Sequence, residues 1–213
     1  MAELLRELAE GRPPTGGGAL EVVPQPPGPV AGVLAFDGHH VVAADVDPGW
    51  VRDLLPPGDL SAPLHPQFLG ALAERLGRRT WDNLDAVFMG HGEPGDVLVP
   101  LEAVDPDHAH PRVARAHTYR LDPVVYELAG GEGLLIIGRG LSGRWEAAFE
   151  VEVAHRGRGL GRLLVRSALR LVPEGEPVFV QVAPGNVSSV RAVLAAGGFT
   201  PIGAEVLFPD PLS

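Results

Sequence analysis

Residues 153–165, VAHRGRGLGRLLV, place three glycines at alternate positions directly before an apolar helical pattern. Glycine has no Cβ, so the backbone at Gly157, Gly159 and Gly161 can adopt positive φ angles and can lie against a bulky group. The N-terminus of the following helix carries unpaired N–H groups and the positive end of the helix dipole. Glycine-rich backbone in this position is typical of a phosphate-binding loop.

The spacing of these glycines argues against two common nucleotide motifs. The dinucleotide fingerprint G-x-G-x-x-G would require glycine at position 162, where Arg162 stands. The ATP-binding loop would require a Gly-Lys-Ser/Thr ending, which the segment lacks. A nucleotide-dependent oxidoreductase or kinase is therefore the less favoured interpretation. A tight strand-to-helix turn without a ligand stays an alternative at this point.

The net charge and the amino-acid composition argue against several other classes of protein and of site. The net charge of −10 disfavours a nucleic-acid or anionic-membrane partner, and no apolar run is long enough to span a bilayer. The absence of cysteine excludes disulfides, thiolate metal sites and a cysteine nucleophile. The opening MAELLRELAEGRPP does not resemble a signal peptide, so we expect a cytoplasmic protein. His39, His40, His108 and His110 lack partners at metal-ligand spacings; we expect loop residues and no metal.

Two segments rich in proline and glycine, at 11–29 and 90–100, predict the organisation of the chain. We expect a small N-terminal α/β unit over residues 1–95 and a second domain over residues 96–213. A short leucine-containing helix begins the first unit. Its other predicted elements are strands at 30–36 and 40–46, a helix at 65–77 and a strand at 84–90.

The second domain has a more regular pattern. A helix is predicted first, followed by three strands whose tight glycine-containing connections indicate antiparallel hairpins. A helix after the glycine loop, an apolar strand, a helix capped by Asn186 and a final strand complete the order. These elements are predicted at 110–120, 123–129, 133–139, 144–153, 160–171, 177–183, 187–196 and 202–208.

The loop Arg156–Gly161, RGRGLG, resembles the acyl-CoA pyrophosphate loop of the GNAT acetyltransferase superfamily, written Q/R-x-x-G-x-G/A. Residues 186–208 resemble the second segment of that family, with an Asn-capped helix, a Gly-Phe ending and a strand. The two matches lie within residues 97–208. The resemblance implies a GNAT-like α/β (α+β) fold, with a mixed, mostly antiparallel sheet flanked by helices. It also implies acetyl-CoA as cosubstrate and acetyl transfer to an amine.

The resemblance further implies which residues contact acetyl-CoA. Backbone groups of the strand before the loop would bind the pantetheine arm, and loop N–H groups would bind the pyrophosphate. Asn186 would lie beside the pantetheine, although a helix cap alone explains it equally well. Arg166 and Arg170 continue the arginine stripe of the helix and are expected to face solvent. The implied binding residues are Val151, Val153, Arg156, Gly157, Arg158, Gly159, Leu160, Gly161, Arg162 and Asn186.

Acetyl transfer needs a group that removes a proton from the acceptor amine. Glu146, Glu150 and Glu152 share one face of the predicted strand because strand side chains alternate. Glu146 lies closest to the usual position of the family's base, and Glu150 is the second candidate. At least two of the three carboxylates are expected to face solvent. His155 beside the loop is expected to be a surface residue.

Two departures from the family pattern leave the function open. The usual position of a tyrosine that protonates the leaving thiolate holds Val193 or Leu194. A non-catalytic acyl-CoA-binding module therefore stays an alternative to a transferase. Only one helix, at 110–120, fits between the segment VLVPLEA (97–103) and the strand at 123–129, so the N-terminal unit is a candidate for completing the acceptor cleft. The acceptor is expected to be a small-molecule or peptide amine, and a homodimer is compatible with the sequence.

Overall fold

The computed structural model describes residues 1–12, 19–36, 38–59, 61–78, 84–105 and 109–210. The helices are α1 (Ala2–Ala9), α2 (Pro48–Leu54), α3 (Pro66–Arg75), α4 (Pro111–Tyr119), α5 (Leu160–Ala168) and α6 (Val187–Ala196). The strands are β1 (Ala19–Val23), β2 (Val30–Phe36), β3 (His39–Ala43), β4 (Asp85–His91), β5 (Leu101–Val104), β6 (Leu121–Leu128), β7 (Gly133–Arg139), β8 (Trp145–Val151), β9 (Pro177–Val182) and β10 (Thr200–Pro209).

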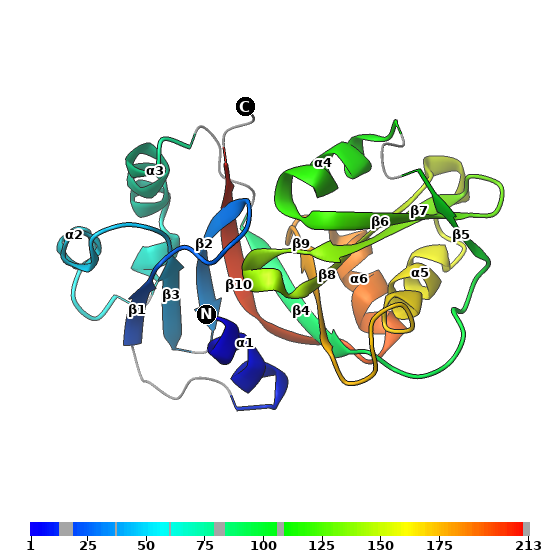
Figure 1. Ribbon diagram of the computed structural model, residues 1–213, viewed down its shortest axis with the longest axis horizontal. Coiled ribbons are helices and arrows are strands. Elements are labelled where there is room, and N and C mark those ends of the chain that lie inside the picture. Colours follow the sequence, from blue (N-terminus) through cyan, green and yellow to red (C-terminus); the bar gives the residue numbers. More distant parts are fainter. Residues whose placement is uncertain (13–18, 37, 60, 79–83, 106–108, 211–213) are drawn as a thin grey trace.

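One ten-stranded sheet runs through the described part of the chain (Figure 1), in the order β1-β3-β2-β10-β4-β9-β8-β7-β6-β5. Neighbours pair antiparallel except β1 with β3 and β8 with β9, which are parallel. The predicted GNAT-like α/β class with a mostly antiparallel sheet is confirmed. Apolar, β-branched sequences such as GLLIIGR suit the central strands because both of their faces are covered by other elements.

The predicted domain boundary at residues 95 and 96 does not coincide with a gap in this sheet. Strand β4, from the N-terminal segment, pairs on one side with β9 and on the other with β10. Strand β10, near the end of the chain, pairs in turn with β2. The two segments that differ in sequence character therefore share one sheet.

A fragment that starts at residue 96 is expected to lack a cooperative unfolding transition. It loses β4, whose Val87, Phe88 and Met89 are all buried, and it exposes the facing edges of β9 and β10. Each such side chain contributes about 1.5–3 kcal/mol on burial, against a typical net stability of about 5–15 kcal/mol. Urea denaturation followed by circular dichroism, with size-exclusion chromatography, measures the outcome. A monodisperse fragment that unfolds cooperatively would contradict this expectation.

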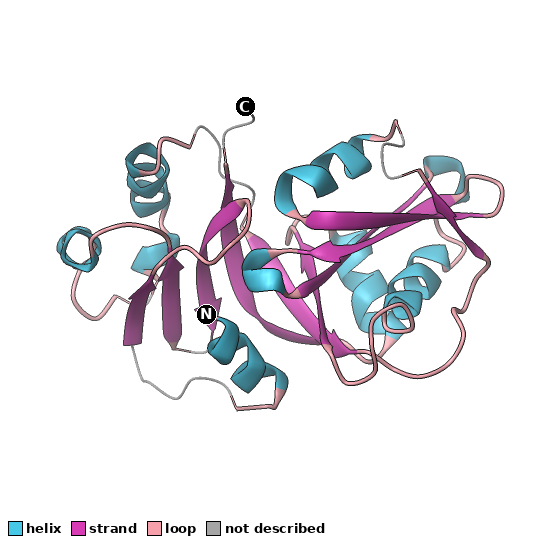
Figure 2. Ribbon diagram, in the orientation of Figure 1, coloured by secondary structure: helices cyan, strands magenta, loops and turns pink. Residues whose placement is uncertain are grey.

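Helices cover both faces of the sheet (Figure 2). Alternating residues of β4 show the division, since Phe88 packs in one core cluster with α5 and α6 while Val87 and Met89 pack in another with α1. Helices α2 and α3 extend the α5–α6 layer over β2, β3 and β10. Helix α4 packs through Val113 and Ala116 against β6 and β7 on the opposite face. Charged side chains between α4 and the sheet are therefore enclosed.

Most predicted strands and helices match the observed ones, but β1, α2 and β5 were not among the predicted elements, and the assignment of two histidines changes. Residues 19–23, assigned to a proline- and glycine-rich separator, form β1 because ALEVV is a short apolar, β-branched run. The prediction that His39 and His40 are loop residues is wrong: both lie in β3 and are buried. Burial and the neighbouring His39 lower the pKa of His40, which favours a neutral ring. His108 lies outside the described residues.

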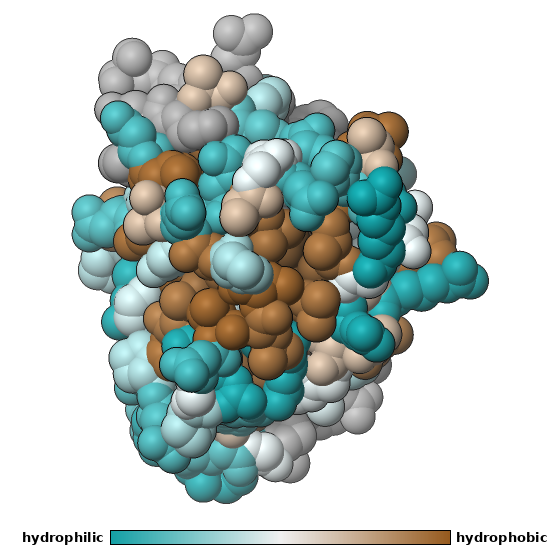
Figure 3. All heavy atoms as spheres, turned by 90° about the vertical axis from the view of Figure 1, so that its right-hand side faces the viewer, coloured by the Kyte–Doolittle hydropathy of each residue, from teal (hydrophilic) through white to brown (hydrophobic). Residues whose placement is uncertain are grey.

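The side of the molecule that carries α5 and β5 has a mixed surface. Hydrophobic residues gather at the centre of this side and hydrophilic residues surround them (Figure 3). None of the helices in the described ranges combines the length and the hydropathy needed to cross a bilayer.

Candidate functional site

Strands β8 and β9 separate soon after they meet. Their parallel pairing consists of Trp145 with Val178 and Glu146 with Phe179, although β8 continues to Val151 and β9 to Val182. Backbone groups along the inner edges of both strands are therefore not engaged in pairing between them beyond this point. Beside this separation lies a groove of about 570 Å³, lined by the end of β8, the glycine loop and α6, which we call the β8–β9 groove.

The glycine loop forms one end of the β8–β9 groove. Gly157 and Gly159 have φ angles of +79° and +82°, in the left-handed region that favours glycine. Gly159 is the N-cap residue of α5, so the first N–H groups of that helix lie next to the groove without intrahelical acceptors. A Cβ at Gly157 would meet nothing within 4 Å, and one at Gly159 would meet only Arg162, at 4.0 Å. This backbone is open to an anionic ligand.

Most of the predicted binding residues line the groove together. They are Val151, Arg156, Gly157, Gly159, Leu160, Gly161, Arg162 and Asn186. Asn186 caps α6 by accepting a hydrogen bond from the Ser189 N–H at 3.2 Å, so the predicted capping role is present. Val153 and Arg158 are not among the lining residues. The strand ends at Val151, and Val153 lies in a 3₁₀ turn with 72% of its surface exposed.

The arginine stripe on α5 differs from its predicted environment. Arg166 and Arg170 were expected to face solvent, but both form ion pairs with Glu93, at 2.5 and 3.1 Å. Arg166 also donates to the carbonyl of Gly197. These contacts join α5 to the segment after β4, so the two arginines stabilise the packing of α5 and lie away from the groove.

His155 is tied to the turn between β6 and β7. Its Nδ1 lies 2.7 Å from Glu132 Oε1, and the ring lines the β8–β9 groove. The contact is supplemented by the backbone, where the Glu152 N–H donates to the Glu132 carbonyl. The residue is partly buried, and its position suits a group that holds the loop in place.

Glu150 lines the groove and pairs with α4. Its Oε2 accepts a hydrogen bond from Arg112 Nε at 2.6 Å, and Arg156 lies 4.0 Å from its other oxygen. Burial acts to raise the pKa of Glu150, but the hydrogen bond and charge of Arg112 outweigh it, so this pKa lies below its ordinary value. Glu152 lies beyond the strand and faces His110 at 3.7 Å. Glu150 is thus an ionised group at the wall of the groove.

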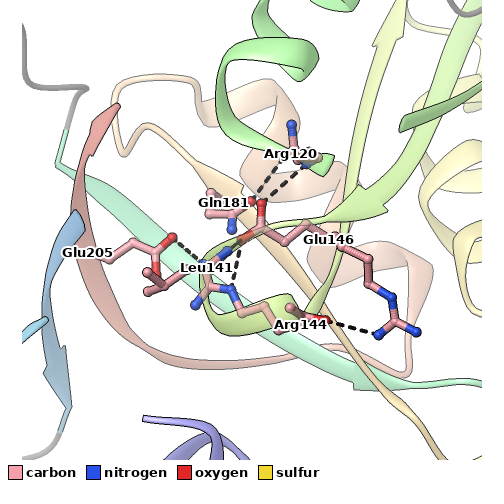
Figure 4. A network of polar contacts seen from close by, with 8 residues as sticks. Arg120, Leu141, Arg144, Glu146, Gln181 and Glu205 are labelled. Carbon is pink, nitrogen blue, oxygen red and sulfur yellow. Dashed lines mark hydrogen bonds and ion pairs between the residues drawn. The ribbon is translucent and has the colours of Figure 1, made fainter. Parts of the chain in front are cut away.

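Glu146 lies deeper, in a buried network of charged residues (Figure 4). Its carboxylate accepts a hydrogen bond from Arg144 Nε at 2.8 Å and lies 3.2 Å from Arg120 Nε. Arg144 also donates to Glu205 of β10 at 2.5 Å. Burial acts to lower the pKa of Arg144, but Glu205 and Glu146 outweigh it and raise that pKa. Glu146 and Glu205 are each 1% exposed, so both depend on Arg144 for charge compensation.

A second hollow of about 210 Å³, which we call the α4 chamber, adjoins the groove. The groove and the chamber share Arg112, Phe149, Asn186 and Ser189. A smaller hollow of about 50 Å³ shares further lining residues with the chamber and ends at Tyr119, Arg120 and Glu146. The other polar side chains lining the chamber are Asp85, Arg115 and Gln181. The groove, the α4 chamber and the smaller hollow are therefore neighbours between the glycine loop and the space beneath α4.

The sequence analysis did not select the polar residues of the α4 chamber. Arg112 and Arg115 are one turn apart on α4, whose Val113 and Ala116 face the core. The spacing of apolar residues in the sequence of α4 would have shown that the two arginines lie beside the buried face of this helix. No local pattern connects Asp85 on β4 with Gln181 on β9, because only the sheet order brings them together.

The splayed parallel pair, the glycine loop at the N-terminus of α5 and the capped helix α6 lie together at one groove, in the order that the resemblance to GNAT acetyltransferases implied. The resemblance to GNAT acetyltransferases predicted from the sequence is confirmed. No protein-family model matches the chain. A segment of 91 residues is 38% identical to mycothiol acetyltransferase from Tsukamurella paurometabola. The match covers 43% of this chain and 30% of that protein, so it spans less than a third of the relative.

Solved structures with a similar fold include an acetyltransferase of the GNAT family from Colwellia psychrerythraea, at 12% identity and a TM-score of 0.40. That alignment covers 67% of this chain and 61% of the other. A GCN5-related N-acetyltransferase from Kribbella flavida is 20% identical with a TM-score of 0.36, and the alignment covers 70% and 65% of the two chains.

Proposed function

We propose that this chain is an acetyl-CoA-dependent N-acetyltransferase. The observation that carries the proposal is the β8–β9 groove with the glycine loop at its end. The open backbone at Gly157 and Gly159 fits a pyrophosphate, since helix N-termini bind anions through N–H groups and the dipole. Arg156 and Arg162 line the same end of the groove and add positive charge. The unpaired inner edge of β8, which lines the groove, suits the amides of a pantetheine arm.

The proposed reaction takes place where β8 and β9 separate. The acceptor amine loses a proton and its nitrogen attacks the thioester carbonyl carbon, so an N–C bond forms. Backbone N–H groups at the open strand edge stabilise the tetrahedral oxyanion. The C–S bond then breaks and the sulfur leaves as a thiolate that is protonated from solvent. An alkyl thiol with a pKa of about 8.5 is a tolerable leaving group without an acid.

The residues at the usual tyrosine position do not supply that acid. Val193 is completely buried in the core, and Leu194 is half exposed. The same observation favours a second candidate function, a module that binds acyl-CoA without turnover.

One experiment separates the two candidate functions. Thermal unfolding with acetyl-CoA, NAD or ATP measures ligand selectivity, and release of free CoA thiol over an amine panel measures turnover. We expect stabilisation by acetyl-CoA alone and thiol release that depends on an amine. Binding without thiol release would favour the binding module, and stabilisation by NAD or ATP alone would refute both candidates.

Glu150 and Glu146 stay the two candidates for the base, and their environments lead to different expectations. Glu150→Gln should lower turnover by about 10²-fold, near the lower end for a positioned base, because Arg112 keeps its pKa low. The loss of turnover in Glu150→Gln should shrink as pH rises, because more of the acceptor amine is then already neutral.

Glu146→Gln should lower the free energy of unfolding more than Glu150→Gln does, because Glu146 is enclosed between two arginines. Steady-state rates at pH 6–9 and urea denaturation of both variants measure these effects.

Acid unfolding provides an internal check on the Glu150–Arg112 pair. Folding lowers the pKa of Glu150, so the pair stabilises the protein above the ordinary carboxylate pKa of about 4.3, and this contribution disappears as pH falls through the lowered value. The Glu150–Arg112 pair is partly exposed, which limits its contribution to stability to about 1 kcal/mol.

The two variants also decide which carboxylate is the base. If Glu146→Gln lost more turnover than Glu150→Gln while its free energy of unfolding stayed unchanged, Glu146 would be the base.

A further inference from the structure

The β8–β9 groove carries more positive than negative charge. The arginines that line it are Arg112, Arg156, Arg162 and Arg191. Glu150 is the only carboxylate among the described lining residues, and it is already compensated, because Arg112 hydrogen-bonds to it at 2.6 Å and Arg156 lies 4.0 Å away. The excess positive charge of the groove therefore belongs to Arg162 and Arg191, in a chain whose net charge is −10.

The guanidinium groups of Arg162 and Arg191 are available to a ligand. Neither forms a hydrogen bond or an ion pair with another side chain in the described part of the chain, and both residues are exposed. The next arginines along α5 differ, since Arg166 and Arg170 both pair with Glu93. Two uncompensated cations on the wall of one groove favour an anionic ligand.

The two arginines lie beside the contact between α5 and α6. Gly161 precedes Arg162 in the chain, and Ala192 follows Arg191. A Cβ at Gly161 would lie 3.5 Å from the Cβ of Ala192, so the helices meet closely at this point. Arg162 and Arg191 are thus attached next to the same contact, one on each helix, and both line the groove.

The groove continues along α6 past this contact. Its lining includes Asn186, the N-cap residue, and Ala195 in the last turn, which are about 13 Å apart along the axis at 1.5 Å per residue. Apart from Arg191, the lining residues that α6 itself contributes are small, namely Ser188, Ser189, Ala192 and Ala195. A ligand whose pyrophosphate lies at the glycine loop can therefore extend further along this helix.

We propose that Arg191, together with Arg162, binds the 3′-phosphate on the ribose of CoA and makes the donor site selective for CoA. This inference rests on the proposed acetyltransferase function. The loop N–H groups serve the pyrophosphate, whereas the 3′-phosphate is a separate monoester with a charge of about −1.5 to −2 at pH 7. Two guanidinium groups match that charge and its three free oxygens. A donor without this phosphate leaves both arginines uncompensated.

The test compares CoA with dephospho-CoA, which lacks only the 3′-phosphate, by titration calorimetry on the full-length chain. We expect CoA to bind at least about 10-fold more tightly. Arg191→Gln should weaken CoA binding by about 10-fold and leave the affinity for dephospho-CoA nearly unchanged, because charge-assisted hydrogen bonds to the missing phosphate are the only ones lost. Arg191→Lys should keep part of the preference, since it retains the charge without the planar guanidinium.

A matched control makes the same charge change away from the groove. Arg52→Gln removes an exposed arginine on α2 that does not line the groove, and it should leave both affinities unchanged. Equal affinities of the parent for CoA and dephospho-CoA, or a preference for CoA that Arg191→Gln does not reduce, would overturn the 3′-phosphate assignment while the acetyltransferase function stands. Failure of both CoA and acetyl-CoA to bind would overturn the function and the assignment together.

Discussion

Gly159→Asp is expected to bind acetyl-CoA at least about 100-fold more weakly than the parent chain. Gly159 is the N-cap residue of α5, in a left-handed conformation, and its missing Cβ leaves the backbone open to the groove. An aspartate there places a carboxylate where the pyrophosphate would lie, so it adds charge repulsion to the loss of charge-assisted hydrogen bonds. Titration calorimetry with acetyl-CoA measures the affinity.

Two control variants separate charge from backbone strain. Gly159→Asn has nearly the same size and tolerates the left-handed region as well as Asp does, so it should weaken binding much less. Gly175→Asp introduces the same residue at a φ of +79° in a turn outside the groove and should keep full affinity. An affinity for Gly159→Asp within a few-fold of the parent, in a folded protein, would show that the loop does not hold the pyrophosphate.

Arg144→Met is expected to lower the free energy of unfolding by about 3–5 kcal/mol. Arg144 bridges Glu146 and Glu205, and all three side chains are buried. Removing the arginine leaves two buried carboxylates with reduced compensation, which costs far more than losing an exposed ion pair. Methionine keeps much of the volume, so a cavity contributes little. Urea denaturation at neutral pH measures the change.

A nearby arginine provides the comparison. Arg139 stacks on Trp145, with its guanidinium carbon 3.4 Å from the ring centre, and donates to the exposed carbonyl of Gly143. Arg139→Met should cost about 1 kcal/mol or less, because that interaction is partly solvated. Similar losses in Arg139→Met and Arg144→Met would mean that the buried network does not stabilise this fold.

Features of the site that depend on a single residue and its immediate neighbours in the chain could be predicted from the sequence. The positive φ at Gly157 and Gly159 follows from glycine, and the cap at Asn186 follows from its side-chain oxygen. Strand alternation correctly places Glu146 and Glu150 on the face that α4 covers. Which of the two is enclosed could not be predicted, because Arg120, Arg144 and Glu205 come from separate elements.

The order of the sheet could not be predicted for a related reason. The sequence patterns for β2, β4 and β10 indicate strands but do not show which strands lie beside them. The pairing of β4 with β9 and β10 is long-range, and no hairpin turn specifies it. Asp85 reaches the α4 chamber only through that pairing, so the contribution of the N-terminal segment to the lining of this chamber follows from topology and not from a motif.

The position of β10 also affects how the chain can fold during synthesis. Strands β2 and β4 leave the ribosome before their common neighbour, residues 200–209, which follows every other strand of the described sheet. Val33 cannot meet Val206 until the segment between them has been made, and contacts of such sequence separation slow folding. One edge of β2 and one edge of β4 therefore stay unpaired during synthesis until β10 has emerged, and exposed strand edges of this kind favour aggregation.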